Sequence, residues 1–251
     1  STVAGRGPSC TARSFERSRR GGRRTRSVRA PAPFVAALAA RQHGVVSRRQ
    51  LLAAGATPCE LRSWLRHRLL ATVHPGVYAT HTGGLTWEQR AWAAVLHAEP
   101  AALHGASAIL SCLGYSRQVS AAAPIQVAVD LGRRLSPRDD VVVHRVARFE
   151  EKSLTWLSPP RARIEEAALD AAAAAADDLG AIAVLAEVVG ARRTTPARVA
   201  AALGSRGRIG RRTLLEGTLA DLSLGACSVL EREYLHRVER AHGLPTAERQ
   251  V

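Results

Sequence analysis

Residues 57–80, TPCELRSWLRHRLLATVHPGVYAT, decide the fold that we predict for this chain. Thr57 is a good N-cap, Pro58 suits the first helical position, and Glu60 completes a T-x-x-E capping box. At about 100° per residue, one face of the predicted helix is apolar and the opposite face is polar or basic. The apolar face carries Leu61, Trp64, Leu65 and Leu69, and the other face carries Cys59, Arg62, Ser63, Arg66 and His67.

Two shorter helices are predicted before this one. Residues 33–44 place their larger apolar side chains on one stripe and stop at Gly44, as a helix does. Residues 45–55 predict a second short helix, with Ser47 as its N-cap and Gly55 at its end.

A β-hairpin is predicted after the third helix. Residues 69–74 and 77–80 alternate in polarity on either side of Pro75-Gly76, a dipeptide suited to a type II turn. Three short helices and a hairpin in this order make a winged helix-turn-helix at residues 34–82. In such folds the third helix enters the major groove of DNA and its N-terminal half contacts base edges. A small helical domain with a solvated basic face is the alternative, because basic helix faces are common.

Positive charge is concentrated at the N-terminal end of the chain. The formal net charge is +15, from 36 Lys and Arg against 21 Asp and Glu. Residues 1–30 hold nine Arg and one acid, and residues 31–80 hold six Arg and one acid. The remaining residues hold 21 bases and 19 acids, a net +2. Codon bias explains Arg in place of Lys, but the shortage of acids at one end indicates a polyanionic partner.

The regions on either side of the winged helix have different compositions. Residues 1–33 form an Arg-rich tail without apolar periodicity, which we expect to be disordered. Residues 83–158 predict a small α+β middle domain. Its helices cover the stretch around Trp92 and the stretch ending at Gly114, the latter capped near Ser107. Its strands, PIQVAVDLG and DVVVHRV, are linked by the basic turn RRLSPRDD.

A helical region is predicted over residues 159–225. Thr195 before Pro196 is a good start for one of its helices. The expected helices are Arg161–Ala176, Ala181–Val189, Pro196–Leu203, Arg211–Leu222 and, beyond this region, Ser228–His242. The fold class that follows is α+β and mostly helical, with a winged helix, a middle α/β region with a small sheet, and C-terminal helices.

Motifs for catalysis or metal binding are not found. The sequence has no phosphate-binding glycine loop, HExxH or GxSxG, and its four Cys are isolated and read as reduced thiols. We therefore expect neither cofactor nor metal. Glu165, Glu166 and Asp170 share a helix face near Arg161 and Arg163, which favours a solvated, ion-paired stripe over an acid/base pair. With no apolar span and no signal peptide, a cytoplasmic protein is expected.

Residues 41–83 resemble the N-terminal winged-helix domain of the AbiEi family of antitoxins. The family pattern G-x-x-x-R-x-Q-L followed by H-x-G-V-Y is matched by Gly44, Arg48, Gln50, Leu51, His74, Gly76, Val77 and Tyr78. The likeness continues through HGASAILSCLG, IQVAVDLGRR, VVVHRV and SPPRARIEEAALDAAA, so that it covers roughly residues 34–251.

This resemblance implies a bacterial DNA-binding transcriptional regulator, the antitoxin of a type IV toxin–antitoxin pair. In the family, the winged helix binds inverted repeats upstream of its own operon and represses it, in line with a homodimer on DNA. The rest of the protein counters a nucleotidyltransferase-like toxin. The helix face assigns Arg62, Ser63, Arg66 and His67 to DNA, and the family and fold analogy adds the others. The predicted DNA-binding residues are Ser47, Arg48, Arg49, Arg62, Ser63, Arg66, His67 and His74.

Residues 226–251 resemble the start of a Vsr-like, restriction-endonuclease-like domain. Glu231 lies where the helix acid of that fold would be, and the chain ends at Val251 before the strands that carry the other metal-binding acids. Without those carboxylates no site can lower the pKa of an attacking water. We therefore expect that the chain is not an enzyme.

Two alternatives to the regulator remain open. The first is a truncated Vsr-like endonuclease-family protein in which the winged helix docks on DNA, inactive over the residues present. The second is a protein–protein module whose basic N-terminus is incidental, because winged helices also bind proteins. The sequence of the DNA beyond codon 251 distinguishes the first of these from the regulator.

Overall fold

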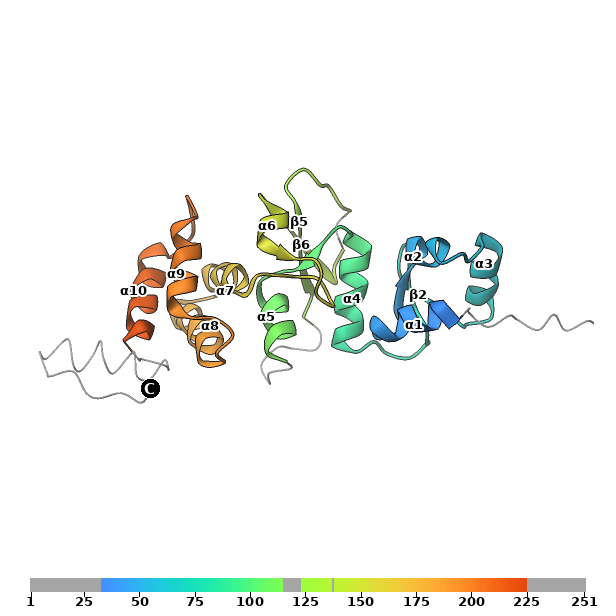
Figure 1. Cartoon of the computed structure of the whole chain (residues 1–251), viewed down its shortest axis with the longest axis horizontal. Coiled ribbons are helices and arrows are strands. Elements are labelled where there is room, and N and C mark those ends of the chain that lie inside the picture. Colours follow the sequence, from blue (N-terminus) through green and yellow to red (C-terminus); the bar gives the residue numbers. More distant parts are fainter. Residues whose placement is uncertain (1–32, 115–122, 137, 225–251) are drawn as a thin grey trace, which may run out of the picture.

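A computed structural model describes residues 33–114, 123–136 and 138–224 (Figure 1). The described part of the chain is α+β, as predicted, and is extended along one axis. A unit built from α1 to β3 lies at one end, a mixed sheet lies in the middle, and helices α7 to α10 lie at the other end. The predicted tail, the predicted helix at 228–242 and the nuclease-like segment 226–251 lie outside the described residues.

The N-terminal unit has the predicted order of a winged helix. Its elements are α1 Pro33–Arg41, β1 Val45–Ser47, α2 Arg48–Ala53, α3 Pro58–Arg66, β2 Ala71–His74 and β3 Val77–Ala79. The strands are antiparallel in the order β1-β3-β2. Gly76 has φ +77° in the hairpin turn, a conformation that favours glycine and fits the third position of a type II turn. Strand β1 was not predicted, because three residues are too few to show an alternation.

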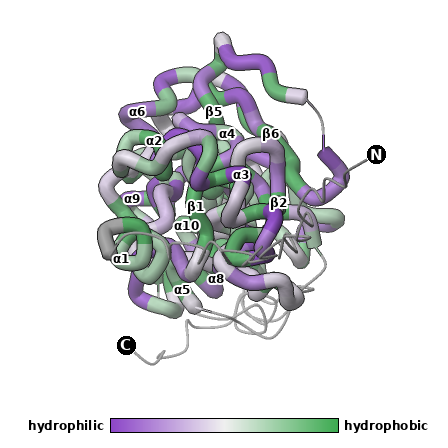
Figure 2. Tube along the Cα trace, turned by 90° about the vertical axis from the view of Figure 1, so that its right-hand side faces the viewer, coloured by the Kyte–Doolittle hydropathy of each residue, from purple (hydrophilic) through white to green (hydrophobic). Residues whose placement is uncertain are grey.

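The two faces of this small sheet pack on different helices. Val46 and Tyr78 face a core that includes Leu51, Leu61, Trp64 and Leu70, between the sheet and helices α1 to α3. Val45 and Val77 face Trp92 and Leu96 of the next helix, α4 Trp87–Ala98. In the view onto the end of the molecule where α3 lies, helices α1, α2 and α3 are arranged around the hydrophobic strand β1 (Figure 2).

The end of α3 differs from the prediction. Leu69 was expected on the buried face, but it is 38% exposed, and Leu70 is buried instead. The helix stops at Arg66, and Arg68 takes a left-handed conformation with φ +56°. Because the chain changes direction at Arg68, the buried apolar position after α3 is taken by Leu70 and not by Leu69.

Helix α4 is buried on two sides. Trp92, Ala93 and Leu96 pack on the N-terminal sheet, whereas Ala91 and Val95 belong to the core of the middle region. The small Ala residues of this helix allow a close approach from both directions. The helix therefore joins the winged helix to the rest of the described chain.

The middle sheet has the strand order β6-β5-β4-β8-β7. The strands are β4 Ala102–Leu103, β5 Ile125–Asp130, β6 Val141–Val146, β7 Ser153–Leu154 and β8 Arg161–Ala162, with helices α5 Gly105–Leu113 and α6 Phe149–Lys152. Strands β5 and β6 were predicted, but they run parallel. The segment between them therefore returns along the length of a strand and is not a tight turn.

Helix α5 begins before its predicted cap. His104 is the N-cap residue, and Ser107 is buried inside the helix, where its Oγ accepts a hydrogen bond from the Gln126 N–H at 2.9 Å. Ser107 thus joins α5 to β5 and does not start the helix. The predicted end at Gly114, with φ +83°, is confirmed.

Four C-terminal helices are present where they were predicted, but the first begins at Ile164 and not at Arg161, because Arg161 and Ala162 form strand β8. They are α7 Ile164–Ala173, α8 Asp178–Gly190, α9 Pro196–Gly204 and α10 Arg212–Ser223. The Thr195 side chain accepts from the Arg198 N–H at 3.3 Å, as expected of an N-cap. Leu169, Leu185, Leu203 and Leu215 are almost fully buried and form one core with the middle sheet.

The acidic residues of α7 are ion-paired but not solvated, which corrects part of the prediction. Glu165 and Glu166 are buried, at 7% and 8% exposure. Their predicted partners, Arg161 and Arg163, instead donate to the carbonyls of Ser111 at 2.9 Å and Glu151 at 2.7 Å. The acids of α7 pair instead with Arg198 and Arg206 from later in the chain, and Glu166 also pairs with Lys152, which precedes α7.

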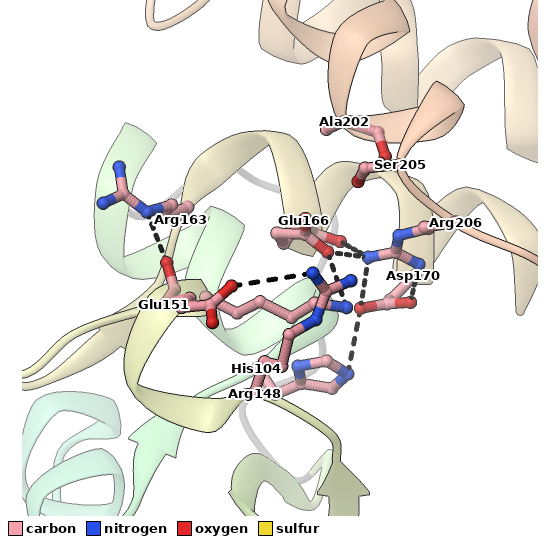
Figure 3. A network of polar contacts seen from close by, with 10 residues as sticks. His104, Arg148, Glu151, Arg163, Glu166, Asp170, Ala202, Ser205 and Arg206 are labelled. Carbon is pink, nitrogen blue, oxygen red and sulfur yellow. Dashed lines mark hydrogen bonds and ion pairs between the residues drawn. The ribbon is translucent and has the colours of Figure 1, made fainter.

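Arg206 is the centre of this network (Figure 3). Its guanidinium lies between Glu166 and Asp170 and is ion-paired with both. Burial alone would lower the pKa of Arg206, but the hydrogen bonds and charges of Asp170 and Glu166 raise it above its usual value. Asp170 also lies 3.4 Å from Nε2 of the buried His104. The network thus ties the loop after α9 to α7 and to the start of α5.

We predict that Arg206→Ala lowers the free energy of unfolding by about 3–5 kcal/mol, because it removes the buried guanidinium between Glu166 and Asp170 and leaves Lys152 as the remaining cation of Glu166. Urea denaturation measures this change. Arg193→Ala, at an exposed arginine, is the matched control, with an expected change within about 0.5 kcal/mol. Equal effects of the two substitutions would contradict a buried, structural role for Arg206.

Candidate nucleic-acid interface

Helix α3 is oriented by its cap and by its buried face. The Thr57 Oγ1 accepts from the Glu60 N–H at 3.2 Å, and the Glu60 carboxylate accepts from the Thr57 N–H at 2.9 Å. Leu61 and Trp64, at 1% and 3% exposure, anchor the helix on the core. The cap fixes where the helix begins, and the anchors fix which side of it meets solvent.

The opposite side of α3 is basic and open. Arg62, Arg66 and His67 are exposed, and Ser63 is half-buried. Among the described residues, neither Arg62 nor Arg66 has a hydrogen bond or an ion pair from its side chain. Two guanidinium groups four residues apart therefore lie on one face of the helix and are available to a partner.

The start of α2 lies beside the hairpin turn. The Arg48 N–H donates to the Gly76 carbonyl at 2.7 Å, and this bond holds the turn against the helix. Arg48 and Arg49 are exposed, and Arg49 is ion-paired with Glu99, which follows α4. A groove of about 420 Å³ runs between the start of α2 and the turn, and its walls include Arg48, Arg49 and Gly76.

Residues 33–81 match the sequence model of the family described as "Transcriptional regulator, AbiEi antitoxin". This part of the chain is similar to AbiEi antitoxin domains, and we call residues 33–81 the AbiEi-type domain. The match ends shortly before α4, and no curated protein matches the chain. The likeness of residues 226–251 to a Vsr-like domain stays a prediction.

The AbiEi-type domain places its predicted DNA-binding residues in two groups. Arg48 and Arg49 at the start of α2, and Arg62, Arg66 and His67 on α3, are at the surface, with Ser63 half-buried between them. Their role in DNA binding stays a prediction. Ser47 and His74, in contrast, are buried at 5% and 2% exposure, so the structure does not place their side chains where DNA could reach them.

Ser47 is buried because it has a structural task. Its Oγ accepts from the Gln50 N–H at 3.2 Å, and the Gln50 side chain accepts from the Ser47 N–H at 2.9 Å. This reciprocal pair is a capping box for α2. The sequence identified the cap correctly, and the cap itself explains why the hydroxyl does not point to solvent.

His74 is buried because α4 covers it. Its ring lies 5.0 Å from that of His97 on α4, and its Nε2 lies 3.7 Å from a carboxylate oxygen of Asp140. Burial lowers the pKa of His74 to about 4, against the opposing effect of Asp140, and Arg138 and His97 lower it further. At neutral pH the ring is therefore uncharged and offers no positive charge to DNA.

Two residues near the AbiEi-type domain were missed by the sequence analysis. Arg68 is exposed just after α3, but the wheel that extended this helix to Leu69 assigned it no role. Glu99 lies outside the matched residues, and nothing in its local sequence indicates that it reaches Arg49. Only the packing of α4 on the sheet brings Glu99 to α2.

The described residues offer neither a metal site nor a membrane span. Within them, no group of three or more His, Cys, Asp or Glu could hold a metal ion. No helix of the described ranges is both long enough and apolar enough to cross a membrane.

We predict that lowering the pH from about 6.5 to about 4 destabilises the fold through His74 and His104, whose pKa values fall to about 4 on folding. The unfolded chain binds protons that these buried rings do not, so the free energy of unfolding rises with pH across this window. Urea denaturation at several pH values measures the slope. His74→Gln should flatten it, and His67→Gln, on the exposed face of α3, should not. Identical slopes for wild type and His74→Gln would refute the prediction.

Proposed function

We propose that the chain is a DNA-binding transcriptional regulator of the antitoxin type, with α3 as its recognition helix. The observation that carries the proposal is the exposed face of α3, where Arg62 and Arg66 have no partner among the described residues. The family description of residues 33–81 supports it independently. Arginine is the residue type that pairs most often with guanine in the major groove. Arg62 is the middle residue of α3 and Arg66 is its last.

The charge of the domain supports a polyanionic partner. Residues 33–81 contain six Arg and one acid, Glu60, and Glu60 is engaged in the cap of α3. The negative charge of Glu60 therefore lies at the start of the helix and not between Arg62 and Arg66, where it would oppose a phosphate. Such a surface attracts phosphate, with an affinity that falls as salt concentration rises.

A single domain of this size has limited specificity. Helix α3 has nine residues, so it is about 14 Å long and spans only a few base pairs. Two copies on an inverted repeat would double the contacted sequence. We therefore propose that the protein binds as a homodimer to inverted repeats in its own promoter and represses its own operon.

The antitoxin part of the proposal concerns a second partner. We propose that the residues beyond the matched domain counter a nucleotidyltransferase-like toxin in the cytoplasm, as in a type IV toxin–antitoxin pair. The family description of residues 33–81 supports an antitoxin, and the class of the toxin comes from the resemblance alone. Co-expression with a nucleotidyltransferase encoded by a neighbouring gene tests it: rescue of growth supports the proposal, and toxicity that is unchanged by the protein rejects it.

We predict that Arg62→Ala and Arg66→Ala each weaken specific DNA binding by about 1–3 kcal/mol if they contact bases, and by less if they contact phosphate only. Gel-shift titration on the promoter of the protein's own gene, over a series of salt concentrations, measures both cases. If the lost contact is to a phosphate, the slope of log affinity against log salt concentration should also become shallower by about one unit.

The matched control for these two variants is Arg208→Ala, at an exposed arginine between α9 and α10. It removes the same charge at a distance from the AbiEi-type domain and should leave the affinity unchanged. An affinity that depends on neither salt nor Arg62 and Arg66 would reject α3 as the recognition helix.

We also propose that residues 1–251 do not cleave DNA. Incubation of the purified chain with supercoiled plasmid and Mg²⁺ or Mn²⁺ should leave the plasmid intact over the range in which gel shifts show full binding. Nicked or linear product that disappears with Glu231→Gln would instead support the nuclease alternative.

A further inference from the structure

Arg49 and Glu99 meet across the boundary between the AbiEi-type domain and α4. Arg49 is the second residue of α2, and its guanidinium is ion-paired with the Glu99 carboxylate. The Arg49 side chain is 67% exposed and that of Glu99 is 34% exposed. The pair therefore lies at the surface, in contact with solvent. Either residue can exchange the other for an ion from solution.

The main chain of Glu99 is held in place by the middle region. Its carbonyl accepts a hydrogen bond from the Arg133 guanidinium at 2.7 Å. Its side chain comes directly after the C-terminal end of α4, which packs on the N-terminal sheet through Leu96. The Glu99 carboxylate thus lies at the surface of the winged helix, although Glu99 itself is outside the matched domain.

Glu99 also lines the groove between the start of α2 and the hairpin turn. The residues that line it come from the start of α2, the hairpin turn and the end of α4. Arg48 and Arg49 are its cations, and Glu99 is the acid among these residues. In a helix-turn-helix, the helix before the recognition helix, here α2, crosses the DNA backbone. The start of α2, and with it this groove, would then lie near phosphates. A carboxylate in this position opposes a phosphate and holds one of the two cations that would bind it.

We propose that Glu99 sets the DNA affinity of the protein by competing with a phosphate for Arg49. The proposal rests on the DNA-binding function proposed above and adds a regulating residue to it. An ion pair as exposed as this one contributes little to stability, so a phosphate can replace the carboxylate at a small free-energy cost. When DNA binds, Glu99 loses Arg49 and takes up a cation from the salt. This uptake offsets one of the cations that the DNA releases on binding, so the salt dependence of the affinity is weakened.

The test compares wild type with Glu99→Gln by fluorescence anisotropy. The probe is a fluorescein-labelled duplex of about 30 base pairs, or three helical turns, from the promoter of the protein's own gene. Glu99→Gln should bind about two- to five-fold more tightly, the range that corresponds to loss of one exposed ion pair. The plot of log affinity against log salt should steepen by about 0.9, equivalent to one more phosphate contact.

A second background separates competition from a general charge effect. In Arg49→Ala, the change Glu99→Gln should have little effect, because the shared cation is gone. Glu187→Gln makes the same charge change on the exposed side of α8 and should leave both the affinity and the salt slope unchanged. Glu99→Ala should repeat the pattern of Glu99→Gln, and thermal melting checks that each variant is folded.

The outcomes also separate this proposal from the function on which it rests. If wild type binds and Arg62→Ala weakens binding, but Glu99→Gln changes neither affinity nor slope, the role of Glu99 is rejected and the regulator stands. An equal gain in the Arg49→Ala background likewise rejects competition for Arg49. If wild type does not bind duplex DNA at all, the proposed function itself fails.

Discussion

The pairing of β1 with β3 is the interaction on which the rest of the described structure depends. Because side chains alternate along a strand, this pair of strands presents Val46 and Tyr78 to one side and Val45 and Val77 to the other. The first side seats the helices that carry the exposed arginines. The second side seats α4, and through it the middle sheet. A shift of this register by one residue would exchange the two faces and disrupt both cores.

The parts of the fold that local chemistry determines were predictable from the sequence. Thr57 and Glu60 lie three residues apart, and the capping box that they form was predicted from that spacing and is confirmed. The apolar spacing of Leu61 and Trp64 likewise predicted which side of α3 is buried. The same reasoning failed at Leu69, because a left-handed residue ended the helix earlier than its apolar pattern did.

Features that depend on distant parts of the chain were not predictable. His74 has an ordinary position in a strand, and only the packing of α4 shows that it is buried against His97. Arg206 pairs with Asp170 across 36 residues of sequence, whereas the sequence favoured the nearer Arg161 and Arg163. The same limit applies to the candidate site: its arginines were found from a helix face, but Glu99 was not, because it reaches them through the tertiary fold.

The burial of α4 on two sides has a geometric consequence. A helix that belongs to two cores cannot rotate relative to either without exposing apolar surface, so α3 and the distant helices α7 to α10 are coupled as parts of one stiff rod. If two copies of the chain associate through those distant helices, the separation of their two α3 helices is set by the rod and not by a flexible tether. The length of the molecule would then determine the spacing between the two DNA half-sites that the α3 helices contact.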